Sequence, residues 1–142
     1  MNKVASLHDY VILNNESPIG YTYDLYTCIA LLIHRNNNSL LAHIEANEQD
    51  NDIDFRYLLD VLNLGKSNIL KIELFPGPDT NKHNLELICL ILDNNGIIYE
   101  VKQPFIDMYG KGSIGYNYNT KDYYLVDENY ELKEAKTLKK TL

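Results

Sequence analysis

The sequence predicts an α+β domain of mixed, largely antiparallel β-sheets with two main helices. Short apolar runs separated by turn residues are typical of antiparallel strands, and residues 28–34 and 40–45 form the clearest such pair. Two longer segments, at about 52–64 and 82–93, have the length and end signals of helices. The 142 residues have the length of one domain, so we expect a single unit spanning residues 1–142.

The first elements follow from local patterns. Residues 10–13 are apolar and end at a turn-forming cluster, so they predict a strand. Residues 22–27 are expected to be a loop that leads into the hairpin. The helix at 52–64 has apolar residues at i, i+3, i+4 and i+7, a cap at its start and a glycine after it. These residues are Phe55, Leu58, Leu59, Leu62, Asp52 and Gly65.

The later elements alternate in the same way. Residues 67–75 alternate between apolar and polar and stop at a Pro-Gly-Pro turn, which indicates a strand. Residues 82–93 are apolar on every side, and a cap at Thr80 or Asn81 favours a buried helix there. Residues 97–101 predict a strand and residues 116–126 a tyrosine-rich strand pair. The tail from residue 131 is expected to be a solvated helix or a frayed end.

The bulk composition excludes several classes of function. A net charge of −7 argues against nucleic acid as a partner, because no excess of basic residues offsets the phosphates. No apolar stretch approaches the ~20 residues that a membrane span needs, and the N-terminus lacks the apolar region of a secretory signal. We therefore expect a cytoplasmic protein, or one translocated into a host cell without a classical signal peptide, as some bacterial effectors are.

Cys28 and His43 are the residues with the strongest functional potential. The hairpin places them on opposite strands, and an even-length loop directs both side chains to the same face. A two-residue loop at Asn36 and Asn37 would make them diagonal neighbours, roughly 7–8 Å apart by Cα. A thiol that can meet an imidazole is the minimum for an activated nucleophile. Lone thiols in apolar runs are more often core residues, and that interpretation stays open for Cys28.

The other candidate residues predict less. Cys89 lies in an almost unbroken apolar stretch and is expected to be a core residue. His34 can share the face of Cys28 but lies too far along the strand, and His8 and His83 have polar surroundings. Histidine and cysteine spacings give no metal site, and the acidic residues near position 52 favour a loop and helix cap over a calcium loop. We expect no metal and no cofactor.

The segment from Gly20 to Glu45 has the order threonine, cysteine, strand, turn and histidine, given by Thr22, Cys28 and His43. This order resembles the CheD-like cysteine deamidases, which include chemoreceptor glutamine deamidases, deamidating bacterial toxins and, more loosely, N-terminal asparagine amidohydrolases. Weaker similarities cover most of a minimal domain of that kind. The chain departs from the family in the glycine-poor approach to the cysteine and in a single glycine after the strand at 67–75.

The resemblance implies a cysteine-dependent glutamine deamidase that acts on a protein. His43 would take the proton of Cys28, the thiolate would attack a side-chain carboxamide, and Thr22 would orient the imidazole or the substrate amide. Ammonia would leave a thioester that water hydrolyses. Two alternatives stay open: an N-terminal asparagine amidohydrolase, and a catalytically silent binding module on the same scaffold.

Overall fold

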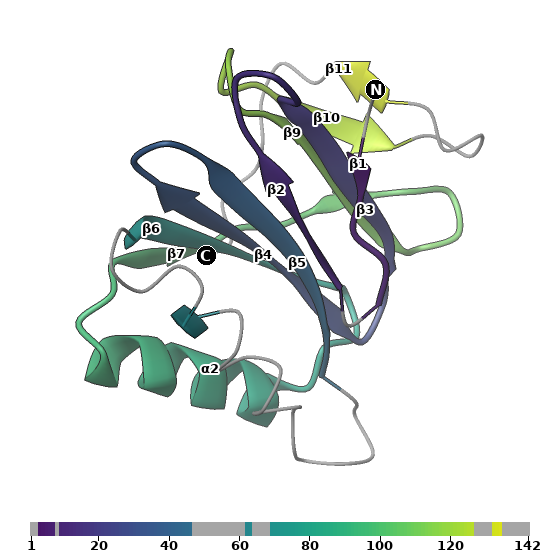
Figure 1. The fold of residues 1–142 in the computed structure, drawn as a ribbon. Coiled ribbons are helices and arrows are strands. Elements are labelled where there is room, and N and C mark those ends of the chain that lie inside the picture. Colours follow the sequence, from purple (N-terminus) through teal and green to yellow (C-terminus); the bar gives the residue numbers. More distant parts are fainter. Residues whose placement is uncertain (1–2, 8, 47–61, 64–68, 127–131, 135–142) are drawn as a thin grey trace.

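The computed structural model describes residues 3–7, 9–46, 62–63, 69–126 and 132–134. In these residues, two β-sheets pack face to face and one long helix covers the far side of one of them (Figure 1). Strands predominate, and most of their pairings are antiparallel. The expected mixed α+β architecture is therefore confirmed at this level, with the difference that only one of the two expected helices lies in the described residues.

The sheet that carries the hairpin, here called the hairpin sheet, has the strand order β2-β5-β4-β6-β7. Its strands are β2 (Tyr10–Leu13), β4 (Cys28–Arg35), β5 (Ser39–Glu45), β6 (Ile69–Pro76) and β7 (Tyr99–Val101). The backbone N–H of Arg35 donates to the Asn38 carbonyl at 2.9 Å, which leaves Asn36 and Asn37 as the two-residue turn. The predicted hairpin and its turn are confirmed.

The second sheet has the order β1-β3-β9-β10-β11, and β8 also pairs with β9. Its strands are β1 (Lys3–Val4), β3 (Ile19–Leu25), β8 (Phe105–Ile106), β9 (Gly112–Asn117), β10 (Tyr123–Val126) and β11 (Leu132–Glu134). The tyrosine-rich pair was predicted at 116–126, and the structure places it in β9 and β10, where Tyr116 faces Tyr123.

Two expectations about this second sheet are wrong. Residues 22–25 belong to strand β3, so only Tyr26 and Thr27 connect β3 to β4. Residues 132–134 form strand β11 and not a helical or frayed tail. Both strands depend on partners that local patterns do not reveal, because β3 pairs with the distant β9 and β11 pairs with β10.

Helix α2 (Lys82–Asn94) confirms the predicted helix at 82–93. The expectation of a buried helix is wrong in part, because only one side is buried, at Asn84, Ile88 and Leu92, while Leu90 is exposed. Its cap is Asn81, whose side chain accepts a hydrogen bond from the Asn84 backbone N–H at 3.2 Å. Gly96, at φ +66°, follows the helix in the left-handed conformation that glycine adopts readily. The expected helix at 52–64 lies outside the described residues except for Leu62 and Asn63, which are helical. No helix in the described residues is long and apolar enough to span a membrane.

The alternation of side chains in the hairpin sheet separates two apolar cores. Residues such as Ile29, Leu31 and Ile33 pack toward α2, and Leu62 joins this outer core. Ala30, Leu32 and Leu41 point the other way and pack against Ile114 and Tyr116 of the second sheet. We call this second side the inner face. Cys28 packs on the same core, so the candidate nucleophile lies between the two sheets.

Candidate functional site

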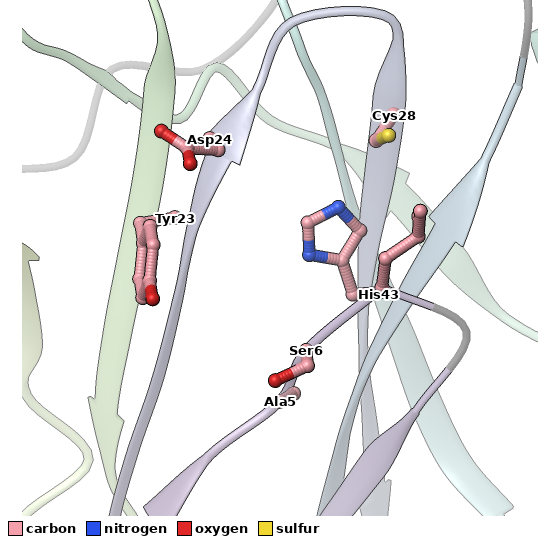
Figure 2. A pocket seen from close by; sticks show the side chains of 7 residues that line it. Ala5, Ser6, Tyr23, Asp24, Cys28 and His43 are labelled. Atoms are coloured by element: carbon pink, nitrogen blue, oxygen red, sulfur yellow. The ribbon is translucent and has the colours of Figure 1, made fainter.

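Strand register places Cys28 and His43 on the same inner face. Cys28 pairs with Glu45 and Ala30 pairs with His43 in the β4–β5 ladder, so Cys28 and His43 are diagonal neighbours. The backbone N–H of His43 donates to the Asp9 carbonyl at 3.0 Å, which fixes this end of β5. Figure 2 shows one ring nitrogen of His43 turned toward Cys28. The prediction that the two side chains share a face is confirmed.

Thr22 contacts the other side of the His43 ring. Its Oγ1 donates a hydrogen bond to the Ala5 carbonyl and lies 2.7 Å from His43 Nδ1. A hydroxyl has one proton to donate, and the Ala5 carbonyl receives it. The Thr22 oxygen must therefore accept the proton of Nδ1, which leaves the lone pair of the neutral ring on Nε2. The geometry fixes the tautomer in which Nε2 can accept a proton.

Thr22 comes from the middle of a strand. It pairs with Ile114 of β9, and its side chain has no exposed surface. His43 is only 5% exposed. Neither residue lies in a loop: the expected loop at 22–27 begins inside strand β3, and both side chains are buried between the sheets. An activity measurement on either variant therefore needs a stability measurement beside it.

A pocket of about 320 Å³ opens beside the Cys28–His43 pair. It is lined by residues from the segment after β1 and from β3, β4 and β5: Ala5, Ser6, Leu7, Tyr23, Asp24, Cys28 and His43. In Figure 2, the Tyr23 and Asp24 side chains extend from β3 on the side away from Cys28 and His43. Thus the thiol and the imidazole both reach a space large enough for a side-chain carboxamide.

The electrostatic surroundings of Cys28 keep its thiol protonated. Burial raises the pKa of Cys28, and the negative charge of Glu45 on the paired position raises it further. Hydrogen bonds with Thr27 and with the Ala46 backbone oppose this rise. A thiol whose pKa is raised in this way does not alkylate at unusually low pH. Any attack by this sulfur needs a base that removes the proton as the new bond forms.

The turn after β6 holds the backbone of Cys28. The Gly77 N–H donates to the Cys28 carbonyl at 2.8 Å, and the Thr80 hydroxyl donates to the same oxygen at 3.3 Å. A Cβ at Gly77 would lie 2.5 Å from the Tyr26 carbonyl oxygen, so only glycine allows this approach.

Asp24 also lines the pocket, and no local sequence pattern selects it. Its φ is +59°, in the left-handed region that residues other than glycine rarely adopt, although aspartate tolerates it better than most. The register of β3 against β9 shifts between Thr22 and Leu25, which marks a β-bulge at Tyr23 and Asp24. Such a bulge depends on the pairing with β9, so a single aspartate before an apolar residue does not predict it.

The remaining candidates lie elsewhere. Cys89 is half-buried on α2, on the opposite side of the hairpin sheet from Cys28, and both thiols are free. Cys89 packs against the outer core, which agrees with its predicted place in the core, although it is only half-buried. His83 is exposed as expected, and His8 and the acidic residues 50–54 lie outside the described residues. Within the described residues, no group of three histidine, cysteine or acidic side chains could hold a metal ion.

Comparison with known proteins does not place the chain in a family. No protein-family model matches the sequence, and no curated protein matches it. The functional argument therefore depends on the geometry of the site itself.

Proposed function

We propose that this protein is a cysteine-dependent amidohydrolase that converts glutamine to glutamate in a protein substrate. The hydrogen bond between Thr22 Oγ1 and His43 Nδ1, 2.7 Å long, is the observation that supports the proposal most. It fixes an imidazole that accepts a proton at Nε2, on the same face as a thiol and beside a pocket. A nucleophile, a base and a residue that orients the base are the parts of such a site.

In the proposed reaction, Nε2 of His43 removes the thiol proton while Cys28 Sγ attacks the carboxamide carbon of the substrate. The tetrahedral intermediate collapses as the imidazolium returns its proton to the departing nitrogen, so ammonia leaves and a thioester remains. Nε2 then takes a proton from water as the water oxygen attacks the thioester. The C–S bond breaks and the same proton restores the thiol. The product is a carboxylic acid, which gives its remaining proton to solvent and becomes the carboxylate.

The raised pKa of Cys28 makes this proton transfer part of the attack. Because burial and Glu45 disfavour the resting thiolate, a preformed thiolate–imidazolium pair is not the ground state. The substrate would therefore be needed before the sulfur becomes a strong nucleophile. The same raised pKa favours the second candidate function, a binding module in which Cys28 is packed and chemically silent.

Mass spectrometry of lysate proteins distinguishes these two functions. We expect glutamine-to-glutamate conversion after incubation with the purified protein and none with Cys28→Ser. Cys89→Ser is the matched control, because it removes the other thiol from the far side of the hairpin sheet and should leave the conversion intact. Conversion that persists in Cys28→Ser, or that is absent with the unaltered protein, would contradict the deamidase proposal.

A further inference from the structure

The last pair of the β4–β5 ladder places a carboxylate beside the thiol. Cys28 lies directly opposite Glu45, and residues in this relation project to the same face of an antiparallel pair. The backbone N–H of Arg35 donates to the Asn38 carbonyl at the turn, and the hydrogen-bonded pairs alternate along the hairpin from there. Cys28 and Glu45 therefore form a pair of the other kind, in which the side chains are closest, with Cβ atoms roughly 4.5–5.5 Å apart.

The charge around Cys28 is negative. Burial is the first cause of the raised pKa of its thiol and the charge of Glu45 is the second, which agrees with the short distance that the register gives. His43 adds no positive charge in the neutral tautomer that Thr22 fixes. Among the described residues that line the pocket, none is lysine or arginine. Asp24 also lines it, but its side chain extends from β3 on the side away from Cys28 (Figure 2). A group that reaches the sulfur therefore meets a negative potential, set mainly by Glu45.

A deamidase has to distinguish a carboxamide from a carboxylate. The glutamine and glutamate side chains have nearly the same shape, so the size of a pocket cannot separate them. They differ in charge: the carboxamide is neutral and its nitrogen donates hydrogen bonds, whereas the carboxylate is negative and only accepts them. A fixed negative charge beside the nucleophile repels the carboxylate and not the carboxamide.

We propose that Glu45 is a specificity-determining residue, whose charge makes the site accept the neutral carboxamide and repel the carboxylate that the reaction produces. Glu45 acts through the potential at Cys28. The inference rests on the proposed function for the identity of substrate and product, and on the strand register for the charge. Repulsion empties the site after each turnover and keeps aspartate and glutamate side chains away from the thiol. The same charge attracts cations, which allows a test without turnover.

Charged thiol reagents measure the potential at Cys28. When the thiol reacts with a methanethiosulfonate, its proton goes to solvent, its sulfur forms a disulfide with the reagent and methanesulfinate leaves. The experiment compares the cationic aminoethyl reagent with the anionic sulfonatoethyl reagent. Each rate is followed by the mass of the Cys28 peptide and divided by the rate of that reagent with 2-mercaptoethanol. Both reagents need the same thiolate, so its population cancels in the ratio of the two corrected rates. We expect this ratio to favour the cation about three- to thirtyfold at low salt, and to fall as salt is added.

Glu45→Gln is the decisive variant, because it removes the charge and keeps the size of the side chain. We expect it to remove most of the cation preference, whereas Glu45→Asp should keep much of it. Two matched controls should keep the preference. Asp24→Asn removes a charge whose side chain extends away from the thiol, and Glu86→Gln removes an exposed charge from α2. Circular dichroism should show all four variants folded. A corrected ratio near one in the unaltered protein, or a preference that survives Glu45→Gln, would overturn the proposal.

Protection of Cys28 from the neutral methyl reagent tests the discrimination itself. Two acetylated and amidated peptides without other charges differ only in a central glutamine or glutamate. In the unaltered protein, the glutamine peptide should protect at a roughly tenfold lower concentration, and in Glu45→Gln the two peptides should protect equally. Equal protection in the unaltered protein, or a difference that persists in Glu45→Gln, would overturn the proposal. Failure of the glutamine peptide to release ammonia would contradict the deamidase proposal, and the reagent ratio would still decide the role of Glu45.

Discussion

The β4–β5 hairpin carries a histidine near each end of the inner face, and the two histidines have different surroundings. His43 contacts the Thr22 hydroxyl and lines a pocket with Cys28. His34 lies between two partners, with Nδ1 at 3.2 Å from Ser39 Oγ and Nε2 at 2.5 Å from Glu73 Oε1. Both histidines lie on the inner face of one hairpin, His34 on β4 and His43 on β5, so the partners that surround each ring decide which imidazole can meet a substrate.

The His34 end is a buried ionic network. Glu73 also accepts hydrogen bonds from Tyr123, at 2.6 and 2.7 Å, and from Lys102. Burial alone would raise the pKa of Glu73, but hydrogen bonds from His34, Lys102 and Tyr123 lower it to about 2. Tyr123 belongs to the second sheet, so this network joins the two sheets. We therefore interpret the His34 end as a structural contact and the His43 end as the reactive one.

Replacement of each histidine gives the largest expected contrast. His43→Ala should lower deamidation by about 1,000-fold or more, because the base and the nucleophile act as one unit. His34→Ala should retain most of the activity in the molecules that fold. The measurement is the rate of ammonia release per folded protein, with the folded fraction taken from urea unfolding. If His34→Ala lost as much activity as His43→Ala, the assignment of the two ends would be wrong.

Glu73→Gln should have the next largest effect, and on stability alone. It leaves the Lys102 ammonium, whose side chain is 13% exposed, without its carboxylate, which typically costs about 3 kcal/mol of unfolding free energy. Glu100→Gln is the matched control, because Glu100 pairs with Glu73 in the adjacent strand but bonds Lys71 at the surface. An exposed pair contributes at most about 1 kcal/mol. If urea unfolding showed that Glu73→Gln and Glu100→Gln lower the unfolding free energy by the same amount, the network would not be what joins the two sheets.

The same network predicts how stability depends on pH. The pKa of Glu73 is about 2 in the folded protein against an ordinary value of 4.5. A lowered folded pKa stabilises the protein above pH 4.5, and the contribution disappears as the pH falls from 4.5 toward 2. This shift corresponds to about 3 kcal/mol. The stability difference between the unaltered protein and Glu73→Gln should therefore shrink over that interval, and a constant difference would contradict the assignment.

Thr22 gives the smallest expected effect and tests the His43 end most finely. Thr22→Val keeps the shape but removes the hydroxyl, and should lower kcat roughly 10- to 100-fold by releasing the imidazole tautomer. Thr22→Ser restores the hydroxyl and should recover most of the activity. Because the tautomer sets which nitrogen accepts the proton, the valine variant should also show a changed pH profile of kcat. If Thr22→Val lowered the stability but left the pH profile of kcat unchanged, the role of Thr22 would be purely structural.

Local sequence patterns were enough to predict the hairpin, because its register depends only on whether the turn has an even or odd number of residues. The Asn36–Asn37 turn fixes which residues pair, and alternation then assigns Cys28 and His43 to one face. Helix α2 was predictable for a similar reason, since its cap and its length are local. Thr22 could be selected only through the family resemblance. No family model and no curated protein matches the sequence, so that resemblance depends on the order of the residues alone.

The rest of the site depends on contacts between residues that are far apart in the chain. Thr22 lies on β3 because β9 pairs with it, and its hydroxyl orients His43 because the Ala5 carbonyl lies nearby. The His34–Glu73 contact joins residues 39 positions apart, and in the alternating run 67–75 Glu73 has the pattern of a solvent-facing side chain. Single-strand patterns cannot show which polar residue a second sheet will cover.

The turn after β6 has a consequence for the time at which the site forms. The Cys28 carbonyl is held by Gly77 and by Thr80, which is 52 residues later in the chain. Ribosomal synthesis delivers Cys28 and His43 well before that turn, and Thr22 is paired only after β9 has been made. A nascent chain therefore has the thiol and the imidazole before it has the frame that aligns them. The complete arrangement of Cys28, His43 and Thr22 therefore cannot assemble before β9 (Gly112–Asn117) has been synthesised.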